Sequence, residues 1–402
     1  MWSFKLSPEQ RQLRATVRKF CANEIEPVTG LLDEHKLLPY DLIRRYLKEI
    51  EGADGIRTVA DLRERQQSFD FIAKALITIE TCRVCPGFAL SLGASIELAG
   101  YAISYGGRPD QIERFGLPIF RGDKIGAWGL TEPEAGSDVQ GMKTTARREN
   151  GGYVLNGQKT FITNAPYADT FVIYAKAPAG ITAFIVERGA EGLSTSEPFE
   201  KMGHRASPTG AIYLDEVKVP EELRLGEEGK GFWLALNNLN HERAHTPAMM
   251  IGIMERCIED ATRYARERVQ FGKPIIKFQG LQFMLARMWT KLTASYGLLF
   301  TLGQMDDLGL DISAAASAAK LFSTESATAV ALDAIQIMGG YGYMKEYKVE
   351  RFLRDAKLME IGAGTSQIQM LIMARLLEKM EPIELNPMFA GPSPFGHRPE
   401  PV

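Results

Sequence analysis

The sequence predicts an α+β protein in which a β domain lies between two helical domains. Helical periodicity covers residues 1–122, short strand-like segments follow in 123–230, and helical periodicity returns in 231–385. The predicted strands are separated by Gly, Pro and Asn, which favours an antiparallel barrel or sandwich over alternating βαβ units. The last segment, 386–402, is rich in proline and is expected to form an extended tail.

Composition indicates a globular protein of enzyme size. Hydrophobic residues make up 45% of the 402 residues, enough for a large core in two or three domains. The formal net charge of -3 and the absence of a long Lys/Arg block argue against nucleic acid as a partner. Residues 1–5 lack the apolar core of a signal peptide, and no uncharged run reaches the roughly 18 residues of a membrane span. We therefore expect a cytoplasmic protein with no signal or transit peptide and no membrane span.

The four cysteines suit a reducing compartment. Cys82 and Cys85 have the spacing of a metal or redox pair, but no second pair and no clustered histidines accompany them. Both lie in an apolar helical pattern. Packing is the preferred interpretation, and no metal site is predicted.

The first helix is predicted to begin at Ser7. The tetrapeptide from Ser7 to Gln10 has the form of a capping box, with Pro8 at the first helical position. The main predicted strands are 153–155, 171–175, 181–186, 210–214 and 217–219. A turn is predicted at Asn156-Gly157. No G-x-G-x-x-G follows a strand and no P-loop is present, so a nucleotide cofactor would have to bind by another route.

Two segments of the β region carry features suited to a ring system or an anion. Residues 128–138 read WGLTEPEAGSD, a turn sequence with clustered backbone N–H groups and hydroxyls. Residues 156–164 read NGQKTFITN. The first segment alone would be read as a structural turn, and it is the pair at this spacing that is informative.

These two segments resemble the flavin-contacting segments of the acyl-CoA dehydrogenases. Further matches follow in the family's order, at RERVQFGKP (266–274), FQGLQ (278–282), QIMGGYG (336–342), RFLRDA (351–356) and IGAGTSQ (361–367). The resemblance covers roughly residues 85–378. It implies the acyl-CoA dehydrogenase fold, with an N-terminal helical domain, a central antiparallel β domain and a C-terminal four-helix bundle.

The resemblance also implies that FAD is the cofactor. The residues it assigns to FAD are Trp128, Leu130, Thr131, Gly136, Ser137, Phe161, Ile162, Thr163, Arg268, Phe271, Gln279, Gln336, Gly339, Gly340, Thr365 and Gln367. An arginine for the pyrophosphate, glycines that permit close approach and aromatic and threonine contacts to the ring explain binding without a Rossmann fold. Arg268, Gln279 and residues 336–340 would reach the FAD of a neighbouring subunit, which implies a dimer of dimers.

The catalytic base is predicted on a helix. Many members of the family carry the proton-abstracting glutamate in the turn that corresponds to 361–367, but here that position is Ala363. Glu242 stands where the isovaleryl-CoA and long-chain branches of the family keep theirs. A glutamate on a helix is more often exposed and ion-paired than catalytic. The resemblance nevertheless favours Glu242 as the base. Pro247, five residues later, is expected to disturb the helix.

The resemblance assigns substrate contacts to Ser137, Asn240, Arg243, Ala363 and Gly364. Asn240 replaces the aspartate that is usual in the family. The thioester oxygen is expected to bind a backbone N–H in the 362–364 turn, whose small residues leave space for branched or alicyclic acyl groups. Ala89 stands where glutaryl-CoA members carry an arginine, which disfavours a dicarboxylate substrate.

The sequence therefore predicts FAD-dependent dehydrogenation of an acyl-CoA thioester, with electron-transferring flavoprotein as the electron acceptor. Two activities of the same fold stay open: dehydrogenation of an acyl or prolyl thioester on a carrier protein, and flavin-dependent N-monooxygenation, which needs no carboxylate base. A non-catalytic scaffold is the third alternative. Activity with free CoA esters would separate an acyl-CoA substrate from a carrier-bound one. Rapid reoxidation of the flavin by oxygen would favour the monooxygenase, and a colourless purified protein would favour the scaffold.

Overall fold

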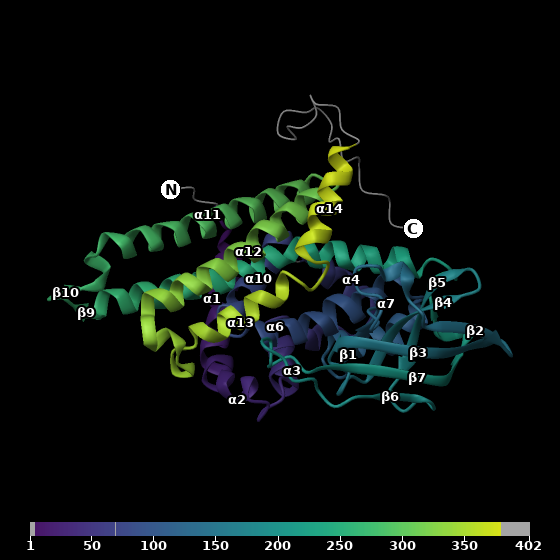
Figure 1. The fold of residues 1–402 in the computed structure, drawn as a ribbon. Coiled ribbons are helices and arrows are strands. Elements are labelled where there is room, and N and C mark those ends of the chain that lie inside the picture. The colour runs from purple at the N-terminus through teal and green to yellow at the C-terminus, as the bar shows by residue number, and fades with distance from the viewer. Residues whose placement is uncertain (1–4, 69, 379–402) are drawn as a thin grey trace. The chain divides into compact units, whose positions relative to one another are not determined.

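The computed structural model describes residues 5–68 and 70–378, which fall into two compact units (Figure 1). Unit 1 contains the described residues of Met1–Ala22, Phe69–Pro86 and Asn240–Val402. Unit 2 contains Asn23–Ser68 and Gly87–Leu239. The helices of the N-terminal region are thus divided between the units. The proline-rich tail predicted for 386–402 lies outside the described residues.

In unit 1, α1 (Pro8–Phe20) begins as the sequence predicts. The Ser7 hydroxyl accepts a hydrogen bond from the Gln10 backbone N–H at 3.1 Å, and the Gln10 side chain accepts one from the Ser7 N–H at 2.9 Å. Pro8 occupies the first helical position, where its missing N–H costs no hydrogen bond. The predicted capping box is confirmed.

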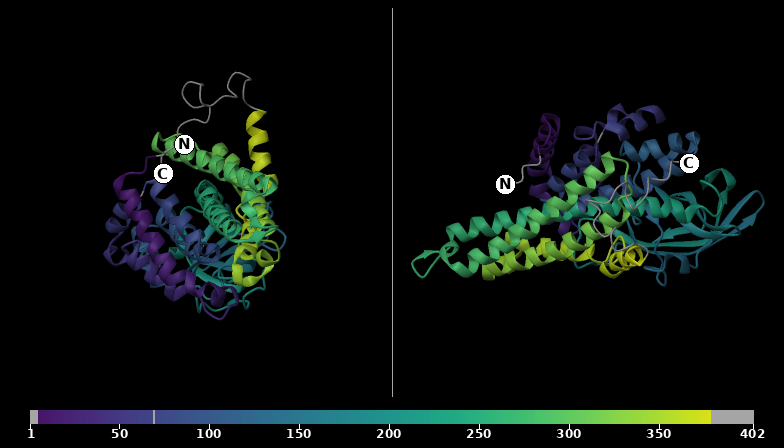
Figure 2. Two further views of the ribbon diagram at one scale, coloured as in Figure 1. Left: turned by 90° about the vertical axis from the view of Figure 1, so that its left-hand side faces the viewer. Right: turned by 90° about the horizontal axis from the view of Figure 1, so that it is seen from above.

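Unit 1 is a helical assembly in which small residues let helices approach closely. Its long helices are α5 (Phe71–Cys82), the part of α10 (Gly231–Glu267) from Asn240 onward, α11 (Gln279–Asp307), α12 (Ser313–Met338), α13 (Val349–Met359) and α14 (Ser366–Leu377). The strands β9 (Val269–Gln270) and β10 (Lys273–Pro274) form a hairpin that joins α10 to α11 at one end, as Figure 1 and Figure 2 show. A Cβ on Gly252 of α10 would lie 2.4 Å from the Ile79 carbonyl oxygen and 2.9 Å from the Cys82 Cβ, so α5 and α10 meet there without room for a side chain.

The α10 helix continues through Pro247. Pro247 lacks the N–H of a helical residue. The Thr246 hydroxyl, directly before the proline, donates to the Glu242 backbone carbonyl one turn earlier at 2.9 Å. The proline therefore does not end the helix that carries Glu242.

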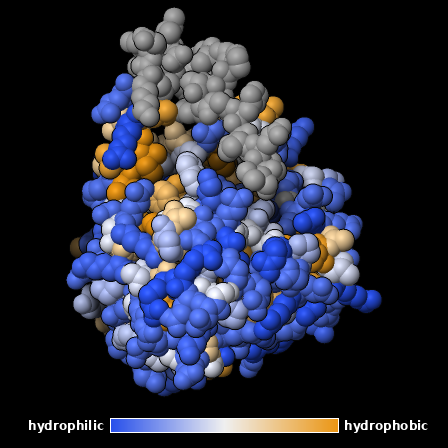
Figure 3. All heavy atoms as spheres, turned by 90° about the vertical axis from the view of Figure 1, so that its right-hand side faces the viewer, coloured by the Kyte–Doolittle hydropathy of each residue, from blue (hydrophilic) through white to orange (hydrophobic). Residues whose placement is uncertain are grey.

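Unit 2 contains the short helices of the N-terminal region and the whole β domain. The helices are α2 (Thr29–Asp33), α3 (Tyr40–Glu49), α4 (Val59–Ser68), α6 (Pro86–Gly93, with Pro86 itself in unit 1), α7 (Tyr101–Gly106), α8 (Pro109–Gln111) and α9 (Leu117–Phe120). Figure 3 views the molecule from the right-hand side of Figure 1, and the side chains on that face are mainly hydrophilic.

Among the described residues, one helical stretch, Pro86–Gly106, has the length and apolar composition of a membrane-crossing segment. Glu97 interrupts it, so the stretch contains no uncharged run of membrane-spanning length. Of its apolar window, 61% is buried inside the protein, and the Ser95 hydroxyl accepts a hydrogen bond from the Gly126 N–H at 2.9 Å. A buried core helix meets the same length and composition criteria.

The β domain is one eight-stranded sheet in the order β6-β7-β3-β2-β4-β5-β8, with β1 paired to β4. The strands are β1 (Gly126–Gly129), β2 (Thr145–Glu149), β3 (Gly152–Thr163), β4 (Thr170–Ala177), β5 (Gly180–Glu187), β6 (Leu193–Thr195), β7 (Thr209–Pro220) and β8 (Arg224–Leu225). The pairs β1–β4 and β2–β4 are parallel, so the sheet is mixed and not wholly antiparallel as predicted. Neither pair is joined by a tight hairpin, and the longer connections allow parallel pairing.

The turn predicted at Asn156-Gly157 is a β-bulge. Strand β3 runs through both residues, and its register with β7 shifts between Leu155 and Gly157. The Asn156 side chain accepts from the Glu216 N–H at 2.9 Å, which binds the irregular point of β3 to β7. Asn-Gly permits unusual backbone geometry in either structure, so the dipeptide alone does not separate a hairpin turn from a bulge.

Candidate functional site

In unit 2, the structure brings together the two segments that the sequence assigns to the flavin. Trp128 lies on β1 and donates from its indole N–H to the Tyr174 hydroxyl at 3.0 Å. The Thr131 carbonyl, just after β1, accepts from the Thr160 N–H at 3.0 Å. At the end of β3, Phe161 is 69% exposed and has φ 58°. An exposed aromatic ring held in a left-handed backbone conformation is an unusual arrangement that suits contact with a ligand.

The remaining residues predicted in unit 2 lie on the same two segments. Leu130 and Ile162 are buried and belong to the core side of the segments, whereas Gly136 and Ser137 are exposed in the loop and Thr163 is half-buried.

A buried ion pair fixes the loop that carries Thr131 and Ser137. The Lys159 side chain is fully buried, and its ammonium donates to the Glu132 carboxylate at 2.6 Å and to the Leu130 carbonyl at 3.2 Å. Glu132, which is 5% exposed, also accepts from the backbone N–H groups of Lys143 and Thr144. Burial lowers the pKa of Lys159 to about 8, and the Glu132 carboxylate opposes this shift. The pair ties both ends of the loop to β3.

In unit 1, a strained turn joins α13 to α14. Ala363 has φ 53° and Gly364 has φ 89°. The left-handed conformation favours glycine, and an alanine there indicates that surrounding contacts hold the backbone in place. A Cβ on Gly364 would lie 2.8 Å from the Gln369 side-chain nitrogen, so a side chain there would displace the Gln369 amide as well as strain the backbone at φ 89°. The Thr365 hydroxyl then starts α14 by accepting from the Ile368 N–H at 3.2 Å.

Side chains from three helices bind the carbonyl oxygens of this turn. Lys320 of α12 donates to the Gly362 oxygen at 2.8 Å and to the Gly364 oxygen at 2.5 Å. Arg243 of α10 approaches the Ala363 oxygen at 3.4 Å. Gln369 of α14 donates to the Gly364 oxygen at 2.9 Å. Gln369 also approaches the Ala363 oxygen at 3.4 Å, so five side-chain hydrogen bonds hold the carbonyl oxygens of the turn.

Glu242 lies beside this cluster. It is half-buried and directly precedes Arg243 on α10, whose guanidinium also donates to the Asn240 side chain at 3.0 Å. Burial lowers the pKa of Arg243, and burial lowers the pKa of Lys320 to about 8. In both cases the negative charge of Glu242 opposes the shift. The structure thus brings Glu242, Asn240 and Arg243 together with Ala363 and Gly364.

A third group of predicted residues lies at the hairpin end of unit 1. The Arg268 guanidinium carbon lies 5.8 Å from the centre of the Tyr341 ring, which follows Gly339 and Gly340. Phe271, at the tip of the hairpin, is 93% exposed, and Gln279 and Gln336 are exposed as well. At a helical rise of about 1.5 Å per residue, Arg268 lies roughly 39 Å along α10 from Glu242. This hairpin group and the turn group therefore form separate sites within unit 1.

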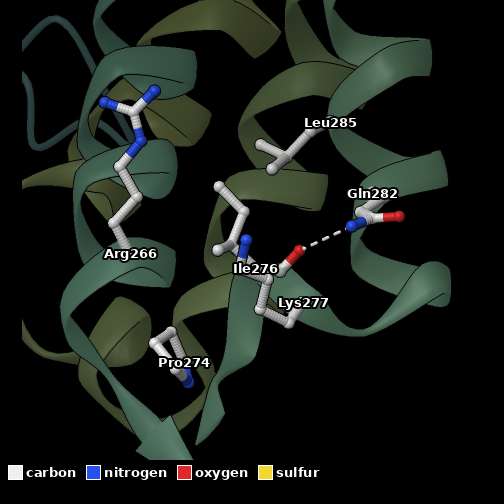
Figure 4. A pocket seen from close by; sticks show the side chains of 6 residues that line it. All are labelled: Arg266, Pro274, Ile276, Lys277, Gln282 and Leu285. Carbon is white, nitrogen blue, oxygen red and sulfur yellow. Dashed lines mark hydrogen bonds between the residues drawn. The ribbon is translucent and has the colours of Figure 1, made fainter.

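A hollow of about 590 Å³ adjoins the hairpin. Its lining residues, drawn in Figure 4, are Arg266, Pro274, Ile276, Lys277, Gln282 and Leu285. The Gln282 side chain donates to the Ile276 carbonyl at 3.1 Å and closes one side. None of the residues predicted to bind cofactor lines this hollow.

Each of the three groups, taken by itself, has features suited to contact with a flavin nucleotide. The Ser366 hydroxyl and the Gln369 side-chain oxygen are buried beside the turn and have no hydrogen-bond partner within the described part of the chain. A Cβ on Gly136, Gly339 or Gly340 would meet no atom within 4 Å, so the backbone is open to a close-lying ligand at each. In unit 1 the unpartnered polar atoms and the open glycines suit the polar parts of FAD, and in unit 2 the exposed Phe161 ring suits its aromatic ring system.

Two buried lysines that organise these segments were missed from the sequence. Lys159 pairs with Glu132 across 27 residues of chain, and no local pattern indicates such a pair. Lys320 could have been singled out from the sequence, because it is the only Lys or Arg in α12, a helix rich in small and apolar residues. A single cation on a buried helical face indicates a specific acceptor nearby.

Family models match most of the chain. The acyl-CoA dehydrogenase N-terminal, middle and C-terminal domain models match residues 7–123, 127–217 and 229–378. The short-chain-specific acyl-CoA dehydrogenase of Clostridium acetobutylicum is 36% identical over 386 residues, covering 92% of this chain and 98% of the relative. The mitochondrial isovaleryl-CoA dehydrogenase of Oryza sativa subsp. japonica is 38% identical over 378 residues, covering 92% of both chains.

A solved structure with bound cofactor is also similar. The acyl-CoA dehydrogenase of Bacillus anthracis complexed with FAD matches with a TM-score of 0.86 and 34% identity, covering 94% of this chain and 68% of that one. The predicted fold, with helical N-terminal and C-terminal regions around a β domain, is confirmed. The chain belongs to the acyl-CoA dehydrogenase family, whose members are FAD-dependent oxidoreductases that act on the CH–CH group of acyl-CoA.

Proposed function

We propose that this protein dehydrogenates an acyl-CoA thioester to the 2-enoyl-CoA, with Glu242 as the base that removes the α proton. The observation that carries the proposal is the convergence of Arg243 and Lys320 on the turn at Ala363, with the Glu242 carboxylate beside them. No carboxylate occupies the turn at Ala363, and removal of an α proton needs a positioned acceptor. Glu242 supplies that acceptor from α10.

The turn supplies the second requirement, a donor for the thioester oxygen. As the α proton leaves, negative charge develops on this oxygen, and preorganised N–H groups stabilise it. The Ala363 N–H is the proposed donor, since the neighbouring peptide carbonyls are held in place by side chains. Arg243 and Asn240 orient the thioester portion of the substrate against α10. Bound FAD supplies the two-electron acceptor for the hydride that leaves the β carbon.

The small residues at the turn support a branched or alicyclic acyl group. Gly362 and Ala363 add little volume, and a Cβ on Gly362 would meet only the Leu358 carbonyl, at 3.6 Å. Ala89 provides no charge to pair with a distal carboxylate. The isovaleryl-type branch, in which the base lies on the helix, is therefore the proposed place of this chain within the family.

The hairpin group supports a homo-oligomer. Arg268 and Glu242 are roughly 39 Å apart along α10, farther than the flavin and pyrophosphate of one cofactor molecule can reach. If Arg268 and the turn beside Glu242 both contact FAD, they contact different FAD molecules. We therefore assign Arg268, Phe271, Gln279, Gln336, Gly339 and Gly340 to the cofactor of a neighbouring subunit in a dimer of dimers. Electron-transferring flavoprotein is the proposed acceptor that reoxidises the reduced cofactor.

The experiment is an anaerobic titration of the purified yellow protein with a panel of acyl-CoA esters, followed at the flavin absorption near 450 nm. Bleaching by a free acyl-CoA supports the proposal. Bleaching only by a carrier-protein thioester would move the function to carrier-bound substrates. A flavin that no thioester reduces, but that oxygen rapidly reoxidises after chemical reduction, would favour the monooxygenase alternative.

A further inference from the structure

Lys320 is a buried cation with an unusual set of partners. It is 1% exposed and lies on α12 among small and apolar residues. Its ammonium donates to the carbonyl oxygens of Gly362 and Gly364, and no carboxylate of the described chain lies within 4.0 Å of it. The other buried lysine, Lys159, has a carboxylate at 2.6 Å. The hydrogen bonds of the Lys320 ammonium thus go to the backbone of the turn.

These contacts determine where the N–H groups of the turn point. In a trans peptide the C=O and the following N–H point in opposite directions, and no cis peptide occurs in the described chain. When Lys320 holds the Gly362 oxygen, the Ala363 N–H therefore points away from α12. The same holds for Gly364 and the Thr365 N–H. Neither N–H donates to a backbone carbonyl within the described residues.

A purely structural role is a poor explanation for this lysine. Burying an ammonium against neutral carbonyls costs more than burying a methionine of similar length, because water is lost and no counter-charge is gained at contact distance. Burial lowers the pKa of Lys320 to about 8, which reflects that cost. What the lysine adds, and methionine does not, is two directed hydrogen bonds to the turn.

We propose that Lys320 is a positioning residue that aligns the Ala363 N–H as the donor to the thioester oxygen. The inference rests on the proposed function. Lys320 acts through the peptide between Gly362 and Ala363 and does not itself touch the substrate. It keeps the N–H in place before the α proton leaves, so that no reorganisation is needed when charge develops on the oxygen.

The test compares Lys320→Met with Ser317→Ala in the FAD-loaded protein. Ser317 is buried one turn earlier on α12, and its hydroxyl donates only to the Ser313 carbonyl of its own helix. With isovaleryl-CoA, we expect Lys320→Met to lower kcat by about 10²-fold, near the loss caused by removing one oxyanion donor, and to change KM little. Ser317→Ala is expected to keep wild-type values of both. FAD content should match the wild type in both variants.

A spectroscopic measurement reports the hydrogen bond itself. The probe is 3-methylbut-2-enoyl-CoA labelled with ¹³C at its carbonyl, and the readout is the infrared band of that carbonyl in the bound state. A strong donor shifts the band below its frequency in solution. In Lys320→Met the band should return toward the solution frequency, whereas in Ser317→Ala it should stay at the wild-type position.

Hydrogen exchange of the peptide that spans 358–366 tests, independently of activity, whether Lys320 holds the turn in place. Exchange there should accelerate in Lys320→Met and not in Ser317→Ala. If Lys320→Met has wild-type kcat, carbonyl band and exchange while Glu242→Gln is inactive, the inference is wrong and the proposed function stands. If no acyl-CoA reduces the flavin of the wild-type protein, the proposed function fails. Unchanged hydrogen exchange in Lys320→Met would then show that Lys320 does not hold the turn either.

A second variant covers the case in which Lys320→Met does not fold. Lys320→Gln keeps one N–H donor group, which can hold one of the two carbonyl oxygens. We expect an intermediate loss of kcat, about 10-fold, and a partial return of the carbonyl band. Wild-type values for both quantities in Lys320→Gln would then overturn the proposal.

Discussion

Replacing Glu132 by glutamine is predicted to destabilise unit 2 and release FAD. The carboxylate accepts hydrogen bonds from the Lys159 ammonium and from the N–H groups of Lys143 and Thr144. Glutamine retains one accepting oxygen and turns a donating NH₂ toward these donors. Lys159 is left fully buried as a charge whose remaining acceptors are neutral.

The size of the effect follows from the burial of both partners. Removing one partner of a buried ion pair costs about 3–5 kcal/mol, which lowers the Tm of a unit of this size by roughly 6–20 °C. Lys159→Met should cost less, about 1–3 kcal/mol, because Glu132 keeps its two backbone N–H donors. The double variant should be more stable than Glu132→Gln alone, since the unpaired ammonium is gone.

The assay is thermal unfolding by calorimetry, combined with the ratio of flavin to protein absorbance after gel filtration. Glu134→Gln is the matched control, because Glu134 lies in the same loop and pairs with Lys143 on the exposed surface. Exposed pairs contribute little, so its Tm and FAD content should equal those of the wild type. The reasoning is refuted if Glu132→Gln keeps the wild-type Tm and FAD, or if the double variant is less stable than Glu132→Gln.

Three further predictions concern the cofactor, the substrate and unit 1. Arg268→Ala should lower retained FAD and shift the protein toward smaller species in analytical ultracentrifugation; a fully loaded, stable monomer would contradict the shared-site assignment. Branched and alicyclic acyl-CoA esters should have higher kcat/KM than glutaryl-CoA or straight C16 chains, and a reversed order would refute the pocket argument. Glu80→Gln should lower Tm by several degrees, because the buried Glu80 carboxylate accepts from Arg14 at 2.6 Å and from Arg18 at 2.7 Å; an unchanged Tm would contradict this.

Where a structural feature is encoded locally, the sequence predicted it. The capping box at Ser7 needs only four consecutive residues, and the helical and strand-like periodicities need only short windows. The mixed sheet was missed because strand direction depends on which distant strands pair, and β1 pairs with a strand more than 40 residues later. The bulge at Asn156-Gly157 was read as a turn because the dipeptide satisfies both structures.

In the candidate site, too, short sequence motifs were predictable and contacts between distant residues were not. The motifs predicted which segments belong to the candidate site, and the structure brings the two predicted segments of unit 2 together and Glu242 together with the turn at Ala363. The side chains that hold those segments could not be predicted, because Lys320 reaches Gly362 across 42 residues and Lys159 reaches Glu132 across 27. Such pairings depend on the packed fold, and a lone buried lysine shows only that some acceptor must exist.

The most direct test of the account is the rate of flavin reduction in Glu242→Gln. Glutamine keeps the shape and hydrogen bonding of the residue but cannot accept the α proton. With Glu325→Gln, an exposed position on α12, as the control, both variants should fold and bind FAD and acyl-CoA like the wild type. In anaerobic stopped-flow mixing with the best acyl-CoA of the panel, the flavin of Glu242→Gln should bleach about 10²- to 10⁴-fold more slowly, or more slowly still, and the flavin of the control should bleach at the wild-type rate. Bleaching of Glu242→Gln at the wild-type rate would show that Glu242 is not the base.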